Sequence, residues 1–228
     1  MNISQNYWRI KEEIQRTCEQ INRHPDEIKL VAVSKNKPAE MINEAISAGI
    51  TRFGENRVQE AMVKIPQIKA TVEWHMVGTL QTNKVKRAIE LFSIIQSVDS
   101  LHLAEAIERR CGEKNIIMPV LIEVNTSGEP TKHGVQPEQL AELLKQVIHL
   151  PHLRVMGLMT IGPGLAIENP EASRNCFRQL ARLRREMEDK FSISLPELSM
   201  GMSSDFTVGI EEGATIIRIG TAIFGPRS

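Results

Sequence analysis

The chain has 228 residues, of which 41% are hydrophobic and 25% charged, as is ordinary for a globular protein. Its 28 lysines and arginines balance its 28 aspartates and glutamates, so it lacks the basic excess that is typical of nucleic-acid-binding proteins. Its three cysteines are far apart and form no CxxC or Cys/His cluster, which argues against a disulfide scaffold or a zinc site and favours reduced thiols in the cytoplasm.

The first 24 residues predict a helix that covers part of the domain. Tyr7, Ile10, Ile14, Cys18 and Ile21 recur at helical spacing, with charged residues between them. No apolar run in this segment is long enough for a signal sequence or a membrane span. We therefore expect no association with a membrane.

Short apolar runs alternate with helical patterns over the rest of the chain. The runs predict eight strands, at residues 29–34, 52–54, 73–78, 93–98, 119–125, 154–160, 197–201 and 215–220. Helices are predicted between them, at residues 39–48, 57–69, 84–91, 101–110, 137–149, 170–190 and 203–212. This alternation predicts a parallel sheet, and eight units in this length favour a single (β/α)8 barrel domain over residues 1–228. A doubly wound open sheet is the alternative, but the glycine-rich phosphate turn that it calls for after an early strand is missing.

Lys35 stands at the end of the first predicted strand, in the run LVAVSKNKP at residues 30–38. Four consecutive apolar residues predict a buried strand, and Pro38 ends it. Ligands of parallel sheets and barrels bind at strand ends, where a partly dehydrated lysine amine can attack a carbonyl carbon. A solvated lysine at a strand edge is the alternative, and this segment taken alone favours it.

Other polar and small residues end or follow the predicted strands and would share one rim of a barrel with Lys35. They are Asn56 at the second strand, Ser199, Gly201 and Ser203 at the seventh, and Gly220 and Thr221 at the eighth. The last two loops are typical of a phosphate site, because glycine lets a phosphate approach the backbone and a hydroxyl adds a donor. The alternative makes Ser203 and Ser204 helix N-caps and Gly220 a simple turn, but a phosphate site at these two loops recurs in the barrel fold.

Arg218 lies within the apolar run of the eighth strand, where an unpaired charge is costly. It either forms a structural salt bridge with a carboxylate such as Glu123 or binds a ligand ring nitrogen or anion, and the sequence leaves both open. An amine nucleophile, a phosphate site and an arginine on one barrel suggest a phosphorylated aldehyde. Pyridoxal 5′-phosphate fits, with Lys35 forming the Schiff base. No metal-ligand pattern is present.

Several segments of the sequence resemble the pyridoxal phosphate homeostasis proteins. They are LVAVSKNKP at 30–38, FGENRVQE at 53–60, WHMVGTLQTNK at 74–84, VMGLMT at 155–160, LSMGMSSD at 198–205 with IRIGTAIFG at 217–225, and, more loosely, NTSGEPTKHG at 125–134. The likeness runs from about Pro25 to the C-terminus, and the WHxxGxLQxNK block is highly specific. Arg57 stands where the family often has tyrosine, and Met76 where it often has an aromatic residue.

The resemblance implies a barrel similar to the N-terminal domain of alanine racemase. It also implies that Lys35 carries pyridoxal 5′-phosphate as an internal aldimine, that Ser199, Gly220 and Thr221 hold the phosphate, and that Arg218 faces the pyridine nitrogen. An arginine there favours an unprotonated ring nitrogen, which makes the ring a weaker electron sink.

We expect from this a cofactor carrier in intracellular vitamin B6 homeostasis, without robust turnover. Racemases of this fold use a tyrosine base from an additional domain, whereas this chain ends after its eighth strand and its only tyrosine is Tyr7. Expected partners are pyridoxal 5′-phosphate and the apoenzymes that use it, with the protein a cytoplasmic monomer. One alternative is a racemase-like enzyme, which rapid α-proton exchange of amino acids would support. Another is a sugar-phosphate enzyme without a cofactor, which a yellow protein would exclude.

Overall fold

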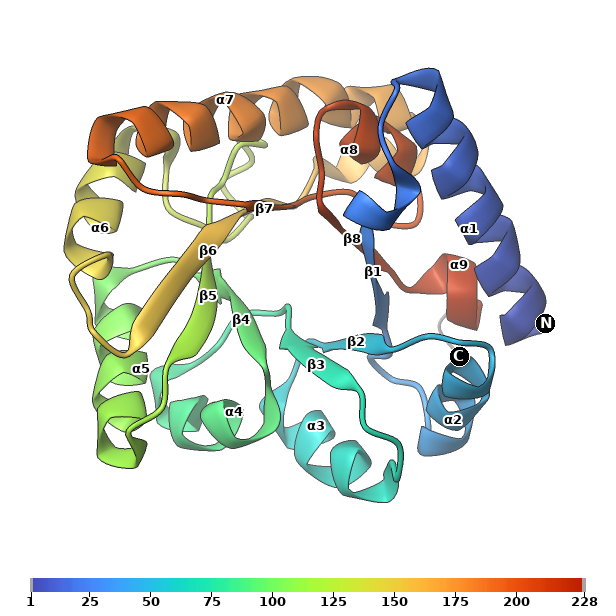
Figure 1. The fold of residues 1–228 in the computed structure, drawn as a ribbon, viewed down its shortest axis with the longest axis horizontal. Coiled ribbons are helices and arrows are strands. Elements are labelled where there is room, and N and C mark those ends of the chain that lie inside the picture. The colour runs from blue at the N-terminus through green and yellow to red at the C-terminus, as the bar shows by residue number, and fades with distance from the viewer. Residues whose placement is uncertain (1, 227–228) are drawn as a thin grey trace.

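The computed structural model describes residues 2–226, in which eight parallel strands close into a barrel in sequence order (Figure 1). The strands are β1 Lys29–Val33, β2 Arg52–Glu55, β3 Glu73–Met76, β4 Ile94–Val98, β5 Met118–Glu123, β6 Leu153–Met159, β7 Glu197–Ser199 and β8 Ile216–Ile219. Pairing of β1 with β8, at Ala32 and Ile219 for example, closes the barrel. The predicted (β/α)8 barrel is confirmed, and the open-sheet alternative is wrong.

Helices surround the barrel in Figure 1; α1 precedes β1, and the others follow the strands in the chain. They are α1 Ile3–Gln20, α2 Ala39–Ser47, α3 Val58–Lys64, α4 Val85–Leu91, α5 Leu101–Lys114, α6 Leu140–Val147, α7 Arg174–Phe191, α8 Phe206–Glu211 and α9 Thr221–Phe224. Short 3-10 turns are found at Pro25–Glu27, Ile65–Gln67, Thr82–Lys84, Pro137–Gln139, Gly164–Ile167 and Pro170–Ser173. Among residues 2–226, none of the helices combines the length and the apolar character that a membrane span needs.

Apolar side chains fill two spaces because side chains alternate between the two faces of each strand. The larger core lies between the strands and the helices. The smaller cluster joins residues of five strands in the barrel interior: Val31, Ile94, Leu121, Met159 and Ile216. This apolar layer leaves the strand ends free to carry polar groups.

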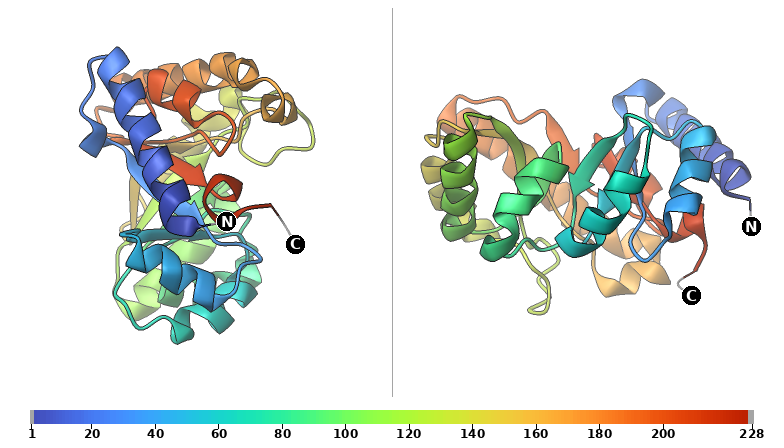
Figure 2. Two further views of the ribbon diagram at one scale, coloured as in Figure 1. Left: turned by 90° about the vertical axis from the view of Figure 1, so that its right-hand side faces the viewer. Right: turned by 90° about the horizontal axis from the view of Figure 1, so that it is seen from below.

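The predicted N-terminal covering helix is confirmed as α1. The Asn2 side chain caps its first turn by accepting from the Gln5 amide at 3.2 Å. Its buried face, which includes Ile10 and Ile14, packs against α2, α8 and α9. Figure 2 shows α1, in dark blue, at one side of the barrel. Asn6 donates to the Ile223 carbonyl of α9 at 2.9 Å, so α1 is fastened to the segment that follows β8.

Candidate functional site

Lys35 follows β1 at the carboxyl end of the barrel and is half-buried. The Ser34 amide donates to the Gly54 carbonyl of β2 at 3.0 Å, so pairing of the two strands continues to the residue before Lys35. A bond of 3.0 Å from the Lys37 amide to the Ser34 carbonyl then turns the chain. Asn36 makes this turn in the left-handed region, with φ of 58°. The lysine is therefore fixed at the rim by the backbone on both sides.

A buried ion pair holds this turn in place. The Lys64 ammonium donates to the Ser34 carbonyl at 2.6 Å and to Glu55 Oε1 at 2.9 Å, and it pairs with Glu60 at 2.5 Å. Glu60 also accepts from the Asn36 amide at 2.5 Å, and the Ser34 hydroxyl donates to Glu55 at 2.6 Å. Burial raises the pKa of the Glu55 carboxyl, although its bonds to Ser34 and Lys64 lower it in part. Sequence reasoning missed these residues; the one signal was the i,i+4 spacing of Glu60 and Lys64.

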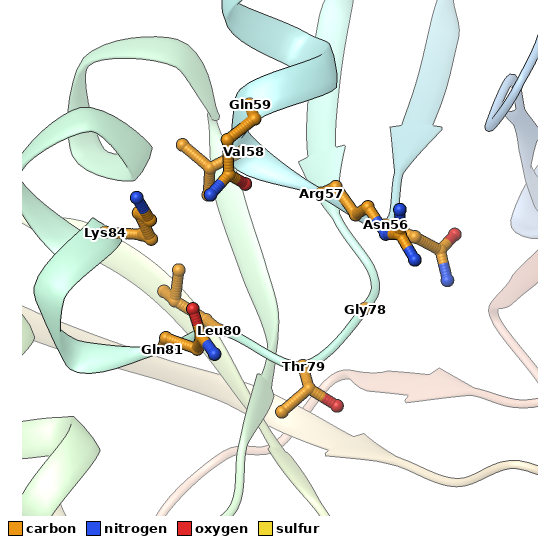
Figure 3. A pocket seen from close by; sticks show the side chains of 9 residues that line it. All are labelled: Asn56, Arg57, Val58, Gln59, Gly78, Thr79, Leu80, Gln81 and Lys84. Carbon is orange, nitrogen blue, oxygen red and sulfur yellow. The ribbon is translucent and has the colours of Figure 1, made fainter.

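A cavity of about 620 Å³ opens between the loops that follow β2 and β3 (Figure 3). Its walls are formed by Asn56, Arg57, Val58, Gln59, Gly78, Thr79, Leu80, Gln81 and Lys84. The two loops touch closely, since a Cβ at Gly78 would lie 2.5 Å from the Asn56 carbonyl oxygen. Side-chain Oδ1 of Asn56 is buried and accepts no hydrogen bond from the described residues. Arg57 and Lys84 are on different sides of the cavity in Figure 3, whereas Met76 lies in the core.

The loops after β7 and β8 are joined by Ser203. Its hydroxyl oxygen accepts from the Gly220 and Ala222 amides, both at 3.2 Å. The alternative in which Ser203 caps the helix that follows it is wrong, because the N-cap of α8 is Asp205 and Ser203 binds the start of α9 instead. The turn that leads from β7 to α8 requires a glycine at Gly201, because its φ is 93° and a Cβ there would lie 2.9 Å from the Phe206 Cα.

Gly220 brings the loop after β8 close to the strand that precedes Lys35. A Cβ at Gly220 would lie 3.4 Å from the Val33 carbonyl oxygen, so the β8 loop lies against the last residue of β1, two positions before Lys35. Thr221 follows at the first turn of α9. The predicted site residues at the ends of β1, β7 and β8 are thus neighbours on one rim, and Asn56 is beside them at the end of β2.

Arg218 is 4% exposed and binds neutral oxygens. Its Nη1 donates to the Ser199 hydroxyl at 2.6 Å, and its Nη2 donates to the Thr160 carbonyl at 2.7 Å. Burial lowers the pKa of its guanidinium to about 10. Within residues 2–226 it makes no ion pair, so the alternative of a salt bridge with Glu123 is not found as a contact. Ser199, which the resemblance places at the phosphate, is fully buried on β7, where its hydroxyl accepts from Arg218 and donates to Gln96.

Glu123 ends β5 and is 3% exposed. Burial raises the pKa of its carboxyl to about 7, and the negative charge of Asp99 raises it further, while Arg218 lowers it in part. The raised value means that the folded protein holds this proton more tightly than the unfolded chain does. The contribution of Glu123 to stability is therefore complete below a pH of about 4.5 and is lost as the pH rises through about 7.

We expect Glu123→Gln to remove this pH dependence. Between pH 5 and pH 8, the free energy of unfolding of the variant should fall by ~2 kcal/mol less than that of the wild type, at about 1.4 kcal/mol per unit of pKa shift. Urea denaturation at both pH values measures the difference. Exposed Glu168 offers a matched control, because Glu168→Gln should leave the wild-type pH dependence intact. An unchanged pH dependence in Glu123→Gln would show that Glu123 does not titrate in this range.

Comparison with known proteins identifies relatives of this chain. Residues 9–228 match the family described as alanine racemase, N-terminal domain. The chain is also 48% identical over 228 residues to a protein of Aquifex aeolicus named pyridoxal phosphate homeostasis protein, which covers 100% of this chain and 99% of that protein. This chain belongs to the pyridoxal phosphate homeostasis protein family.

Solved structures agree with this family membership. PipY of Synechococcus elongatus, a structure with PLP bound, is 38% identical with a TM-score of 0.81, covering 93% of this chain and 99% of that chain. Alanine racemase of Clostridium difficile shares the fold, with a TM-score of 0.80 at 15% identity, and the match covers 99% of this chain but 56% of the racemase. The resemblance of the sequence to this family is therefore confirmed.

Proposed function

We propose that this chain binds pyridoxal 5′-phosphate through a Schiff base on Lys35 and carries the cofactor in vitamin B6 homeostasis. The observation that supports this most is the placement of the Lys35 turn beside the loops of β7 and β8. Gly220 lies against Val33, so an amine and a set of phosphate donors share one rim. PipY, a relative at 38% identity, has been solved with PLP bound.

The groups at this rim suit a phosphorylated aldehyde. When bound, the cofactor supplies an aldehyde and an electron-accepting ring. The Lys35 amine would attack the aldehyde carbon, and the aldehyde oxygen would leave as water. Hydroxyls and amides of Gly201, Ser203, Gly220 and Thr221 would bind the phosphate. The Gly220 amide, which donates to the Ser203 hydroxyl oxygen, would then donate to a phosphate oxygen in its place.

The remaining site residues suit the ring. Buried Oδ1 of Asn56 lacks a partner among the described residues, so this oxygen could accept a hydrogen bond from a ring substituent. Arg218 would face the pyridine nitrogen, and Ser199 would hold Arg218 there. A guanidinium keeps its protons even with the pKa lowered to about 10, so it donates to the ring nitrogen and disfavours its protonation. This makes the bound ring a weak electron sink.

A weak electron sink favours a carrier over an efficient racemase. Racemisation needs a base on each face of the substrate. Tyr7, the one tyrosine of the chain, lies at the opposite end of the barrel, where it lines a small cavity with Leu30 and Arg52 at the starts of β1 and β2. The relatives named as homeostasis proteins agree with this view. Exchange of amino-acid α-protons with deuterated solvent at enzyme-like rates would instead favour the racemase-like alternative.

A comparison of pyridoxal 5′-phosphate with pyridoxal tests the assignment of the phosphate loops. We expect pyridoxal to bind ~100-fold more weakly, since it lacks charge-assisted hydrogen bonds to the loops of β7 and β8. Equilibrium dialysis of both compounds against the purified protein measures the ratio. Equal affinities would remove the phosphate site from the proposal, and failure of both compounds to bind would overturn the proposed function.

We also propose that one barrel domain acts as a cytoplasmic monomer and passes the cofactor to apoenzymes. The cysteines at positions 18, 111 and 176 are free and buried, which agrees with a reducing compartment. Burial raises the pKa of the Cys111 thiol to about 11, so this thiol is unreactive at neutral pH.

A further inference from the structure

A chain of hydrogen bonds continues behind Arg218 through the interior of the barrel. The Ser199 hydroxyl, which accepts from Arg218, lies 2.6 Å from Gln96 Oε1. Gln96 Nε2 lies 2.7 Å from His75 Nδ1, and His75 Nε2 lies 3.1 Å from Glu73 Oε1. This chain of hydrogen bonds therefore leads from β8 and β7 across to β4 and β3. It ends at the amino-terminal residue of β3, at the end of the barrel opposite Lys35.

The direction of every bond follows from Arg218. A guanidinium has only donors, so the Ser199 oxygen accepts and its single proton goes to the Gln96 carbonyl. The Gln96 amide nitrogen must then donate to His75 Nδ1. A neutral His75 carries its proton on Nε2 and donates it to the Glu73 carboxylate. Each member thus fixes the rotamer of the next.

All side chains in this chain of hydrogen bonds are buried except the last one. Ser199 and Gln96 are fully buried, and His75 is 2% exposed. Glu73 is half-exposed and pairs with Arg52 at 3.1 Å. Its hydrogen bond with His75 lowers the pKa of the Glu73 carboxyl to about 2, so the chain ends on a carboxylate that stays ionised. Buried and fully satisfied networks of this kind hold their members rigidly.

We propose that Gln96 and His75 are positioning residues, which hold Ser199 and through it Arg218 in the orientation that faces the ring nitrogen of the cofactor. This inference rests on the proposed function. Arg218 has two described partners, and the Ser199 hydroxyl is the only one that is a side chain. Without Gln96 and His75, that hydroxyl can rotate, and the guanidinium loses the constraint on its Nη1.

Two pairs of variants test the proposal with ¹⁵N-labelled pyridoxal 5′-phosphate. Gln96→Met keeps the volume and breaks the chain, so we expect affinity to fall about tenfold and the pyridine ¹⁵N signal of the bound cofactor to shift. The control is Ser97→Ala on the opposite face of β4, where the hydroxyl has no described partner. Ser97→Ala should retain both wild-type values.

His75 supplies the second pair, which distinguishes positioning from space filling. His75→Leu should act like Gln96→Met, whereas His75→Gln can accept from Gln96 and donate to Glu73 and should restore the wild-type ¹⁵N signal. Wild-type affinity and signal in both Gln96→Met and His75→Leu, while the wild-type protein binds the cofactor, would overturn this inference alone. Failure of the wild-type protein to bind would overturn the proposed function and this inference with it.

Discussion

Lys35→Ala should abolish the yellow colour of the protein incubated with pyridoxal 5′-phosphate. The Schiff base of the cofactor absorbs near ~420 nm, and alanine offers no amine to form it. We expect the affinity for the cofactor to fall at least ~100-fold, because the phosphate and ring contacts remain but the covalent bond is lost. Absorbance and equilibrium dialysis measure the two effects. Thermal unfolding should stay close to wild type, since Lys35 is half-buried at the rim.

Lys37 is the matched control for this experiment. It lies two residues further on, and its ammonium donates to the Pro226 carbonyl at 2.8 Å. Lys37→Ala removes the same charge from the same turn, and it should keep the absorption band. An undiminished band in Lys35→Ala, or its loss in Lys37→Ala alone, would show that the wrong lysine has been assigned.

Lys64→Met should cost ~3–5 kcal/mol of unfolding free energy, the range found when one partner of a buried ion pair is removed. The substitution leaves the Glu55 carboxyl fully buried with its bond from Ser34 but without the Lys64 charge, and its Oε2 already lacks a partner among the described residues. It also releases the Ser34 carbonyl at the base of the lysine turn. Urea denaturation at pH 7 measures the loss, and cofactor affinity should fall along with it.

A double variant separates the buried charge from the lost packing. In Glu55→Gln with Lys64→Met, the uncompensated charge is gone, so at least half of the lost stability should return. Lys69→Met, at an exposed position after α3, controls for the removal of a lysine and should stay within ~0.5 kcal/mol of wild type. A loss below ~1 kcal/mol in Lys64→Met would mean that water reaches Glu55 and that the pair contributes little.

Periodicity is enough to predict the barrel, because most strands lie in short apolar runs and the connections between strands carry helical patterns. Even the polar run of β2, Arg52–Glu55, was found, since the alternation required a strand there. Helix starts were less predictable. Residues from Pro137 and Pro170 form 3-10 turns before α6 and α7 begin, and four-residue α9 is too short to give a pattern.

The rim residues were predictable because the fold brings strand ends together, whereas their supporting contacts were not. Gln96 and Ser199 are 103 positions apart and meet across the barrel, a distance that no local pattern encodes. Arg218 shows the same limit. Its buried position was evident from the sequence, but its partners are a hydroxyl and a carbonyl from β7 and the end of β6 instead of the carboxylate of Glu123.

Borohydride reduction followed by peptide mapping locates the covalent link directly. Reduction converts a Schiff base into a stable amine, so the lysine that held the cofactor keeps a phosphopyridoxyl group through digestion. We predict that the group is found on the peptide that contains Lys35, at that residue, in stoichiometric amount. Labelling of Lys37, Lys84 or Lys132 in its place, or the absence of a labelled lysine in protein saturated with the cofactor, would contradict the assignment of Lys35.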